Sequence, residues 1–169
     1  MKGKVSSMSN KHLSVWGVGP IYVSTISITT FILVVLNLSG KLPTYDFSIP
    51  LLPIILGSLL IIIGIVLWIT AVVLCKLTNK IKENILVTDG VFAYVRNPIY
   101  SAFMLICTGI IVLLNNLFLL FFPVLYWLFL TILLIHTEEK WLRKVYKEEY
   151  EKYCRTVNRC IPFYKRRAK

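Results

Sequence analysis

Charged side chains are scarce in this chain, and acidic ones are the scarcest. Only 16% of the 169 residues are charged, and eight Asp and Glu stand against 19 Lys and Arg. Hydrophobic residues make up 57% of the chain, and the mean hydropathy is +0.73. A soluble domain of this length cannot bury so much apolar surface, so the composition predicts an all-α membrane protein that crosses the bilayer several times.

Cysteine is also infrequent, and its four positions show none of the spacings that bind a metal ion. We therefore expect no metal site. Three of the four cysteines fall in segments that we assign to the reducing cytoplasm, so we expect no disulfide either. Internal repeats and low-complexity segments are absent as well. The sequence predicts a single membrane domain, 1–169, with a scaffold in 1–75 and the functional groups in 76–169.

Four apolar runs are long enough, or nearly so, to cross a hydrocarbon core of about 30 Å. They are residues 15–38, 51–75, 99–114 and 117–135. The third run is short for a span, and only Asn115 and Asn116 separate it from the fourth. We therefore predict four transmembrane helices, the last two forming a tight hairpin. The alternative is a buried helix pair that barely reaches the far side.

The basic residues are distributed unevenly around these runs. Of the 19 Lys and Arg, 18 lie before the first run, between the second and third, or after the fourth, and only Lys41 lies on the opposite side. By the positive-inside rule, both termini and the second loop are cytoplasmic. The pattern also favours contact with anionic membrane lipids and argues against nucleic acid as a partner. We expect the first run to be a retained helix, because it is longer than a signal-peptide core and has no clear cleavage site.

The most informative polar segment is 86–100, with the sequence LVTDGVFAYVRNPIY. Its Asn97-Pro98 step is typical of a helix start, with Asn as the N-cap and Pro at the first helical position. Free N–H groups and the positive end of the helix dipole attract an anion at such a start, and Arg96 adds a full charge. Arg96 also suits a simple topology anchor, so taken alone it does not decide between the two roles.

Two adjacent carboxylates, Glu138 and Glu139, follow the fourth run. If the third and fourth spans are antiparallel, these carboxylates return to the membrane face of Arg96 and Asn97, with an offset of about 7 Å at roughly 1.5 Å per residue. Together the two polar sets suit a zwitterionic soluble cofactor that meets a lipidic substrate. The carboxylates also suit the first turn of a following helix, where negative charge opposes the dipole.

Residues 137–153 predict that following helix, which is amphipathic. Apolar and aromatic side chains fall on one helical face, and Glu and Lys fill the other. The apolar face comprises Trp141, Leu142, Val145, Tyr146, Tyr150 and Tyr153. We expect the helix to lie in the headgroup region or under the membrane helices.

The informative positions form an ordered set along the second half of the chain. In order they are Leu86-Val87, Gly90, Phe92, Arg96-Asn97-Pro98-Ile99-Tyr100, Glu138-Glu139, Glu149-Tyr150-Glu151-Lys152-Tyr153 and Ile161-Pro162-Phe163. This set resembles the integral-membrane methyltransferases of the isoprenylcysteine carboxyl methyltransferase and phospholipid N-methyltransferase group. That family has a Leu-Val-x-x-Gly-x-Tyr/Phe lead, Arg-His-Pro-x-Tyr, a hydrophobic hairpin, a Glu-Glu pair, Glu-Tyr-x-x-Tyr and a Pro-containing tail.

The resemblance implies S-adenosylmethionine as the cofactor, bound at the cytoplasmic face, and a lipid-like or lipidated acceptor that enters from the bilayer. Arg96 and Glu139 are the candidate catalytic residues, and Tyr94 and His136 are the candidate substrate contacts. Methyl transfer is an in-line displacement that depends mainly on positioning. Carried over by position, the cofactor contacts would be Leu86, Val87, Gly90, Phe92, Asn97, Pro98, Tyr100 and Glu138.

Two positions depart from the family pattern. Asn97 stands where the family has histidine, and Leu134 stands where prenylcysteine enzymes carry arginine; His136 is the nearest polar residue to the latter. The acceptor is therefore open between an isoprenylcysteine-type carboxylate, which we slightly prefer, and a phospholipid amine. An amine would need a base, namely Glu139, His136 or water. The alternatives are an NADPH-dependent membrane sterol-type reductase, whose C-terminal half is similar, and a non-catalytic membrane scaffold.

Overall fold

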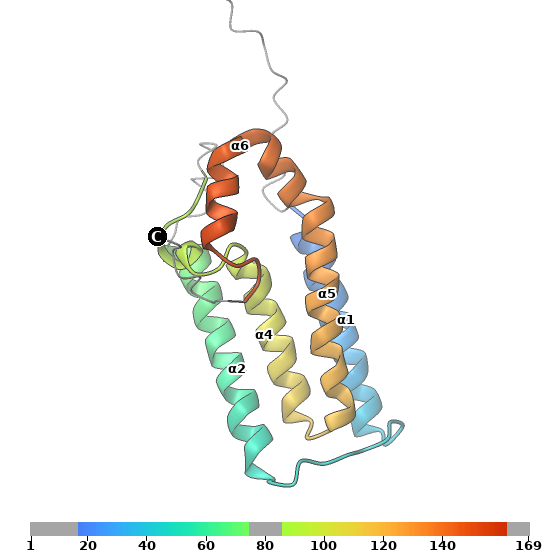
Figure 1. Ribbon diagram of the computed structural model, residues 1–169. Coiled ribbons are helices and arrows are strands. Elements are labelled where there is room, and N and C mark those ends of the chain that lie inside the picture. Colours follow the sequence, from blue (N-terminus) through green and yellow to red (C-terminus); the bar gives the residue numbers. More distant parts are fainter. Residues whose placement is uncertain (1–16, 75–85, 162–169) are drawn as a thin grey trace, which may run out of the picture.

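A computed structural model describes residues 17–74 and 86–161, and within that part of the chain the regular elements are all helices. Helices α1, α2, α4 and α5 stand side by side, and α6 arches over one end of the bundle (Figure 1). The predicted all-α class is confirmed. The main helices are α1 (Gly19–Leu38), α2 (Leu51–Ile69), α4 (Pro98–Leu113), α5 (Phe121–His136) and α6 (Glu138–Thr156), with short helical turns η1 (Thr70–Leu74), η2 (Gly90–Ala93) and η3 (Leu117–Leu120).

Among the described residues, three helical stretches are long and apolar enough to cross a membrane: Gly19–Leu38, Leu51–Val73 and Leu117–His136. The outward face of α2 carries exposed Ile54, Ile62 and Ile65, as expected for a surface that meets lipid tails. The protein is therefore built as an integral membrane protein. Helix α4 has 16 residues, which is short of the usual span length of about 20. The prediction of four full spans remains a prediction.

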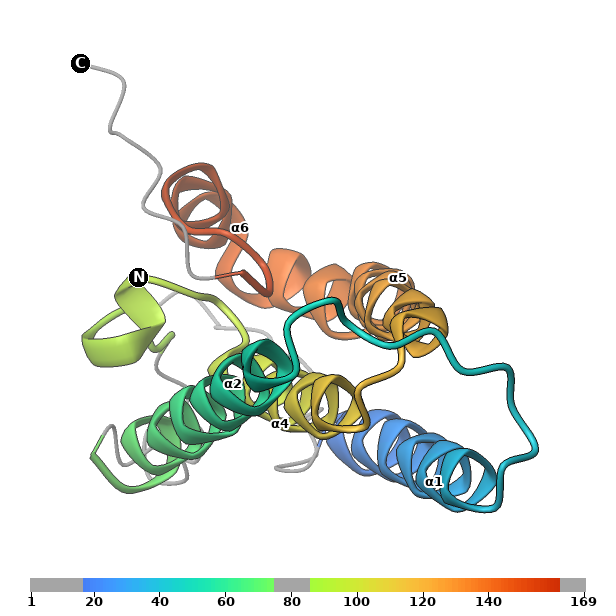
Figure 2. The ribbon, with the colours of Figure 1, turned by 90° about the horizontal axis from the view of Figure 1, so that it is seen from below.

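The tightest helix pair is α2 with α4, and small residues explain it. A Cβ atom added to Gly109 would lie 2.7 Å from the carbonyl oxygen of Gly57, and one added to Gly64 would lie 2.8 Å from that of Ala102. The two backbones touch because no side chain separates them, which is how membrane helices commonly associate. Viewed along the bundle, α4 lies between α2 and α1 (Figure 2). The predicted α4–α5 hairpin is therefore not the closest contact that α4 makes.

The main apolar core lies between α1, α4 and α5. Tyr22, Ile26, Ile111 and Leu130 are fully buried there, and so is Leu134, the residue that stands in place of the family arginine. The far end of the bundle is held by the buried Asn116, whose side-chain amide donates to Asn37 Oδ1 at 2.7 Å and to the Pro43 carbonyl at 3.0 Å. Core packing thus sets the bundle, and the polar candidates gather at the opposite end.

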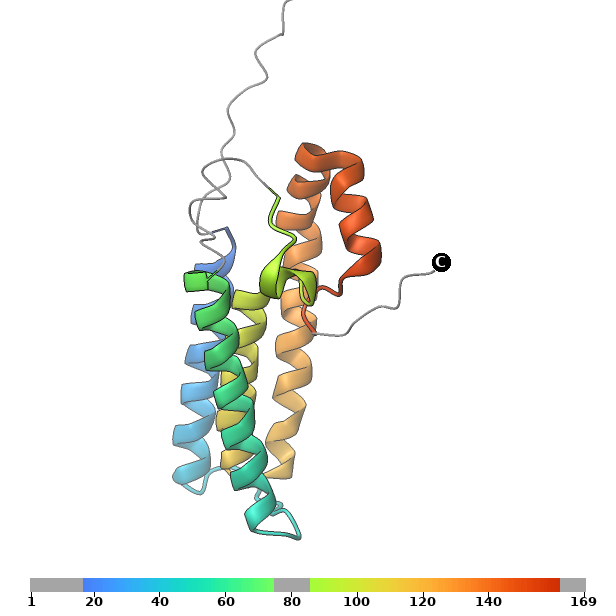
Figure 3. The ribbon, with the colours of Figure 1, turned by 90° about the vertical axis from the view of Figure 1, so that its left-hand side faces the viewer.

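Helix α6 differs from the single straight amphipathic helix that the sequence predicts. Lys147 has φ +46° and ψ −119°, a non-helical conformation in the middle of the element. The second half of α6 consequently folds back toward the segment before α4 (Figures 1 and 3). The expected apolar face is broken at the bend: Val145 is 44% exposed, whereas Tyr150 is 2% exposed.

Candidate functional site

The end of the described chain folds back against the segment that precedes α4. We call residues 157–161 the C-terminal arm. Val95 and Asn158 form an isolated parallel bridge, and the Arg96 N–H donates to the Asn158 carbonyl at 2.9 Å. The Ser101 hydroxyl donates to the Cys160 carbonyl at 2.6 Å. The loop before α4 is therefore fixed by residues that lie more than fifty positions later in the sequence.

Asn97 and Pro98 begin α4 where the sequence places them, with Asn97 at the N-cap and Pro98 as the first helical residue. The Asn97 side chain, however, makes no capping hydrogen bond. Its amide Nδ2 instead donates to the Arg159 carbonyl at 3.0 Å, because the C-terminal arm lies beside it. Asn97 thus contributes to arm docking, a role that a local capping rule does not predict.

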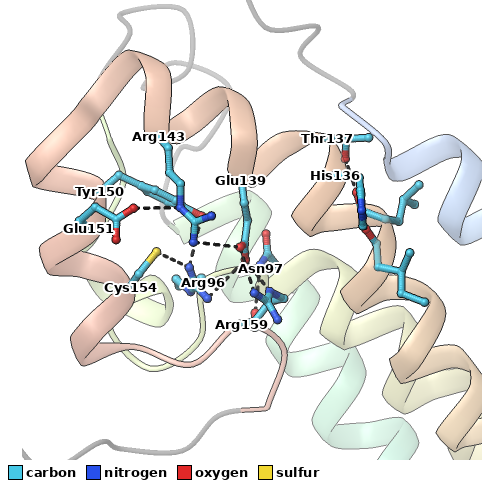
Figure 4. Close-up of polar contacts among 12 residues, drawn as sticks. Arg96, Asn97, His136, Thr137, Glu139, Arg143, Tyr150, Glu151, Cys154 and Arg159 are labelled. Atoms are coloured by element: carbon cyan, nitrogen blue, oxygen red, sulfur yellow. Dashed lines mark hydrogen bonds and ion pairs between the residues drawn. The ribbon is translucent and has the colours of Figure 1, made fainter.

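Glu139 lies at the centre of a cluster of arginines (Figure 4). Its side chain is 1% exposed, and it accepts from Arg159 Nε at 2.5 Å and from Arg159 Nη2 at 3.0 Å. Arg96 Nη2 lies 3.3 Å from Oε1, and Arg143 Nη2 lies 3.9 Å from Oε2. One buried carboxylate therefore joins the loop before α4, the start of α6 and the C-terminal arm.

The arginines keep this carboxylate charged. Burial alone would raise the pKa of Glu139, but the hydrogen bond from Arg159 and the charges of Arg96, Arg159 and Arg143 outweigh it and hold the pKa below its usual value. In turn the hydrogen bond to Glu139 raises the pKa of Arg159. The cluster is therefore a stable ion-pair network rather than a set of groups poised to exchange protons.

Arg96 is held on every side. Its side chain is 8% exposed, its Nη1 donates to the Tyr150 hydroxyl at 3.3 Å and also to the Cys154 sulfur, and its guanidinium carbon lies 5.9 Å from the centre of the Tyr150 ring. Its Nε is buried and has no hydrogen-bond partner in the described part of the chain. Arg96 therefore retains one buried donor without a partner among the described residues.

Glu138 takes a different set of partners from its neighbour Glu139. Its Oε1 accepts from the Tyr100 hydroxyl at 2.6 Å and from the Val18 N–H at 2.8 Å. Burial raises the pKa of Glu138, and the hydrogen bonds from Tyr100 and Val18 only partly offset that effect. The two glutamates therefore differ. Glu139 is buried and ion-paired to arginines, whereas Glu138 is half-buried and its pKa is raised.

The lead segment lines the same end of the bundle. Val87 and Phe92 are buried against Ala71, while Leu86 packs beside the buried tyrosines of α6. The Phe92 carbonyl accepts from the Tyr153 hydroxyl at 2.6 Å. Gly90, in the same segment, has φ +58°, a left-handed conformation that favours glycine. These candidate cofactor residues thus belong to the segment before α4, which packs against Ala71 and the tyrosines of α6.

The two candidate substrate contacts stand apart from the ion-pair cluster. Tyr94 is 57% exposed, and His136 is exposed at the end of α5, where its Nδ1 lies 2.8 Å from the Ile132 carbonyl oxygen. In Figure 4 His136 lies away from the group around Glu139. Neither residue is joined to the cluster by a hydrogen bond in residues 17–74 and 86–161.

Sequence reasoning missed four residues of this end of the molecule. Tyr150 and Tyr153 belong to the Glu-Tyr-x-x-Tyr pattern, and that pattern was a signal for placing them at the site. Arg159 counted only toward the topology, and Val18 had no signal, because its backbone N–H forms the contact. A backbone donor and an arginine in an irregular segment have no period or spacing that identifies them.

Comparisons with known proteins give a consistent family. A family model described as phospholipid methyltransferase matches residues 52–149. The protein-S-isoprenylcysteine O-methyltransferase of Schizosaccharomyces pombe is 39% identical over 86 residues, which cover 50% of this chain and 36% of that protein. A probable protein-S-isoprenylcysteine O-methyltransferase of Oryza sativa subsp. indica is 34% identical over 115 residues, which cover 63% of this chain and 60% of that protein.

The matches leave part of each relative uncovered, since they span 36% and 60% of the two lengths. No solved structure matches the chain with significance. None of the proteins named above is a reductase.

Proposed function

The chain belongs to the phospholipid methyltransferase family, and from that membership we propose that it transfers a methyl group from S-adenosylmethionine to a lipid-like acceptor in the membrane. The observation that supports this most is the environment of the Glu138 side chain. Its carboxylate is half-buried, held by Tyr100 and Val18, and lies at the position where the family resemblance puts a cofactor contact.

The residues at this end of the bundle fit the chemical groups of such a cofactor. S-Adenosylmethionine has a sulfonium, an ammonium, a carboxylate and ribose hydroxyls. Glu138 suits a cation or a hydroxyl, since a carboxylate only accepts hydrogen bonds when ionised. The buried Nε of Arg96, which has no partner among the described residues, suits an anionic oxygen. Val87 and Phe92, which pack against Ala71, offer apolar side chains in the segment before α4.

The chemistry that the cofactor supplies when bound is an activated methyl group on a sulfonium. The work left to the protein is to orient the two reactants in line and to exclude water. Glu138 is suited to holding the donor, and the Arg96–Glu139 pair is suited to holding the loop before α4 in place. We assign Arg96 and Glu139 a positioning role in preference to the catalytic role that the sequence suggests, because Glu139 is 1% exposed and ion-paired to three arginines.

This assignment bears on the acceptor. Glu139 is a poor proton acceptor, because its pKa is lowered by the surrounding arginines. An amine acceptor needs a base, whereas a carboxylate acceptor is already nucleophilic at neutral pH. Because Glu139 is unsuited as that base and His136 lies exposed and away from the cluster (Figure 4), we favour O-methylation of a carboxylate on a lipidated or isoprenoid molecule. The names of the two relatives, both isoprenylcysteine O-methyltransferases, support the same choice. Phospholipid N-methylation, the activity in the family's description, is the second candidate.

We place the site at the cytoplasmic face. Helix α6 and the segment before α4, which carry the polar candidates, lie at the same end of the bundle (Figure 3). The basic residues of α6 and the C-terminal arm belong to that end. The positive-inside rule supports a cytoplasmic location for this end. A soluble cofactor then reaches the site from water, and the acceptor reaches it from the bilayer.

The proposal is tested with the purified chain in detergent. We expect S-adenosylmethionine to release heat in a calorimetric titration and NADPH to release none. Glu138→Ala should weaken binding, while Glu148→Ala, at an exposed position on α6, should not. Absence of heat with S-adenosylmethionine would overturn the proposal. Labelled methyl transfer into a membrane extract then identifies the acceptor, because a base-labile product is an ester and a base-stable product is an amine.

A further inference from the structure

The start of α1 reaches the site through its backbone. The Val18 N–H donates to Glu138 Oε1 at 2.8 Å, although the two residues are 120 positions apart. Val18 is the N-cap residue of α1 and makes no side-chain capping bond of its own. The Glu138 carboxylate, at the first position of α6, therefore accepts a hydrogen bond from the start of α1, residues 17–19, which we call the head of α1. The sequence assigns this helix to the scaffold.

Gly17 makes room for that carboxylate. It has φ +49°, and a Cβ atom there would collide with Glu138 Oε1 and lie 3.2 Å from the Tyr100 hydroxyl. Gly19, two residues later, faces Tyr100 as well, since its Cβ would lie 3.2 Å from the Tyr100 ring. The two glycines thus border Glu138 and Tyr100. At position 17 the backbone is left-handed and there is no room for a Cβ atom, so only glycine fits there.

Groups from the first turns of three helices meet at this carboxylate. Val18 caps α1, Tyr100 lies in the first turn of α4, and Glu138 is the first residue of α6. The positive ends of helix dipoles favour a negative charge there, which opposes the cost of burying it. Both hydrogen bonds go to Oε1, and among residues 17–74 and 86–161 no hydrogen bond to the second oxygen, Oε2, is found.

We propose that residues 17–19 are a positioning element of the cofactor site: the Val18 N–H and the Tyr100 hydroxyl fix Oε1 of Glu138, and Oε2 is thereby aimed at a cationic group of the cofactor. This inference rests on the proposed function and extends the site into the head of α1. The head of α1 contributes a backbone donor and empty space rather than a reactive side chain.

A matched pair of glycine variants tests it. Gly40 has φ +66° and nothing within 4 Å of an added Cβ, so Gly40→Ala carries the same backbone strain as Gly17→Ala without the collision. We expect Gly17→Ala to weaken S-adenosylmethionine binding roughly tenfold or more, as displacement of a positioned group does, while Gly40→Ala binds as the wild type does. Equal affinities for the two variants would overturn the inference.

Two further variants add no bulk and keep the test informative if Gly17→Ala does not fold. Tyr100→Phe removes one of the two donors to Oε1 and should weaken binding without changing the rest of the site. Glu138→Gln keeps an acceptor for Val18 and Tyr100 but replaces Oε2 with an amide donor, so it should lose affinity while the fold is retained. Unchanged affinity in both variants would contradict the inference.

A readout that needs no cofactor completes the experiment. Amide hydrogen exchange of a peptide that covers the head of α1 should be faster in Glu138→Ala than in the wild type, because the Val18 N–H loses its acceptor. Unchanged exchange would show that Glu138 does not hold α1. If the wild type binds no S-adenosylmethionine, the proposed function fails. If it binds, Glu138→Gln weakens binding and Gly17→Ala binds as Gly40→Ala does, only the role of residues 17–19 fails.

Discussion

Replacement of Glu139 by alanine tests whether the arginine cluster holds the C-terminal arm. Glu139 is 1% exposed, and its partners Arg96 and Arg159 are 8% and 26% exposed. Removing one partner of a buried ion pair leaves unpaired buried charge and costs about 3–5 kcal/mol. Because Arg159 keeps some contact with solvent, we expect Glu139→Ala to lie near the lower end of that range.

The matched control is Glu151→Ala. Glu151 Oε1 forms an ion pair with Arg143 Nε at 2.9 Å, but the two side chains are 49% and 46% exposed. An exposed pair of this kind contributes about 0–1 kcal/mol. The two variants remove the same side chain from the same helix, so the difference between them reports burial and not loss of a carboxylate.

The assay is a denaturant titration in detergent, followed by tryptophan fluorescence. Trp141 lies two residues after Glu139 in α6 and reports on this end of the molecule. We expect the free energy of unfolding to fall by roughly 3 kcal/mol in Glu139→Ala and by at most about 1 kcal/mol in Glu151→Ala. Equal losses in the two variants would refute the argument that Glu139 is the buried centre of the cluster.

Three further predictions follow from the same contacts. The arginines lower the pKa of Glu139, so the ionised carboxylate stabilises the fold fully above the ordinary pKa of 4.5, and this stabilisation is lost as the pH falls through the lowered pKa. Unfolding midpoints measured from neutral to acidic pH should show the loss. Glu139→Gln should make the midpoint less dependent on pH. Because burial raises the pKa of Glu138 above 4.5, protonation should begin to weaken cofactor binding above that pH; calorimetry across pH checks this, and a wild-type pH profile in Glu138→Gln would contradict it. Gly109→Ala should destabilise the α2–α4 pair by about 1–3 kcal/mol, because its Cβ would lie 2.7 Å from the Gly57 carbonyl oxygen; unchanged thermal unfolding would show that the backbones separate freely.

Features decided by local chemistry were predictable from the sequence. The apolar runs give the helices, and α4 begins at Pro98 as the Asn97-Pro98 step indicates. In each case the signal and the structure lie within a few residues of each other.

The bend in α6 was not predictable from the sequence. Lys147 is neither glycine nor proline, and non-glycine residues with positive φ are uncommon. The bend coincides with contacts on both sides of it: Arg143 pairs with Glu151 across the turn, and Tyr153 donates to the Phe92 carbonyl. Tertiary contacts of this kind override local helix propensity, which is only a weak guide.

The candidate site was predictable in its members more than in their roles. The sequence brings Arg96 and Glu139 to one membrane face, and the structure places them 3.3 Å apart. The sequence does not show that Glu139 and Glu138 have different partners. That difference depends on Arg159 and Val18, which approach from distant parts of the chain. The roles of the individual residues, the number of full spans and the membrane orientation remain predictions.

The docked C-terminal arm also sets an order of events during synthesis. Glu139 is made 20 residues before Arg159, so the carboxylate has no contact with Arg159 until the arm has been translated. The loop before α4 is likewise without its backbone partners until the arm has been translated. The polar end of the molecule is therefore complete only after the arm has been translated and has docked beside the loop before α4.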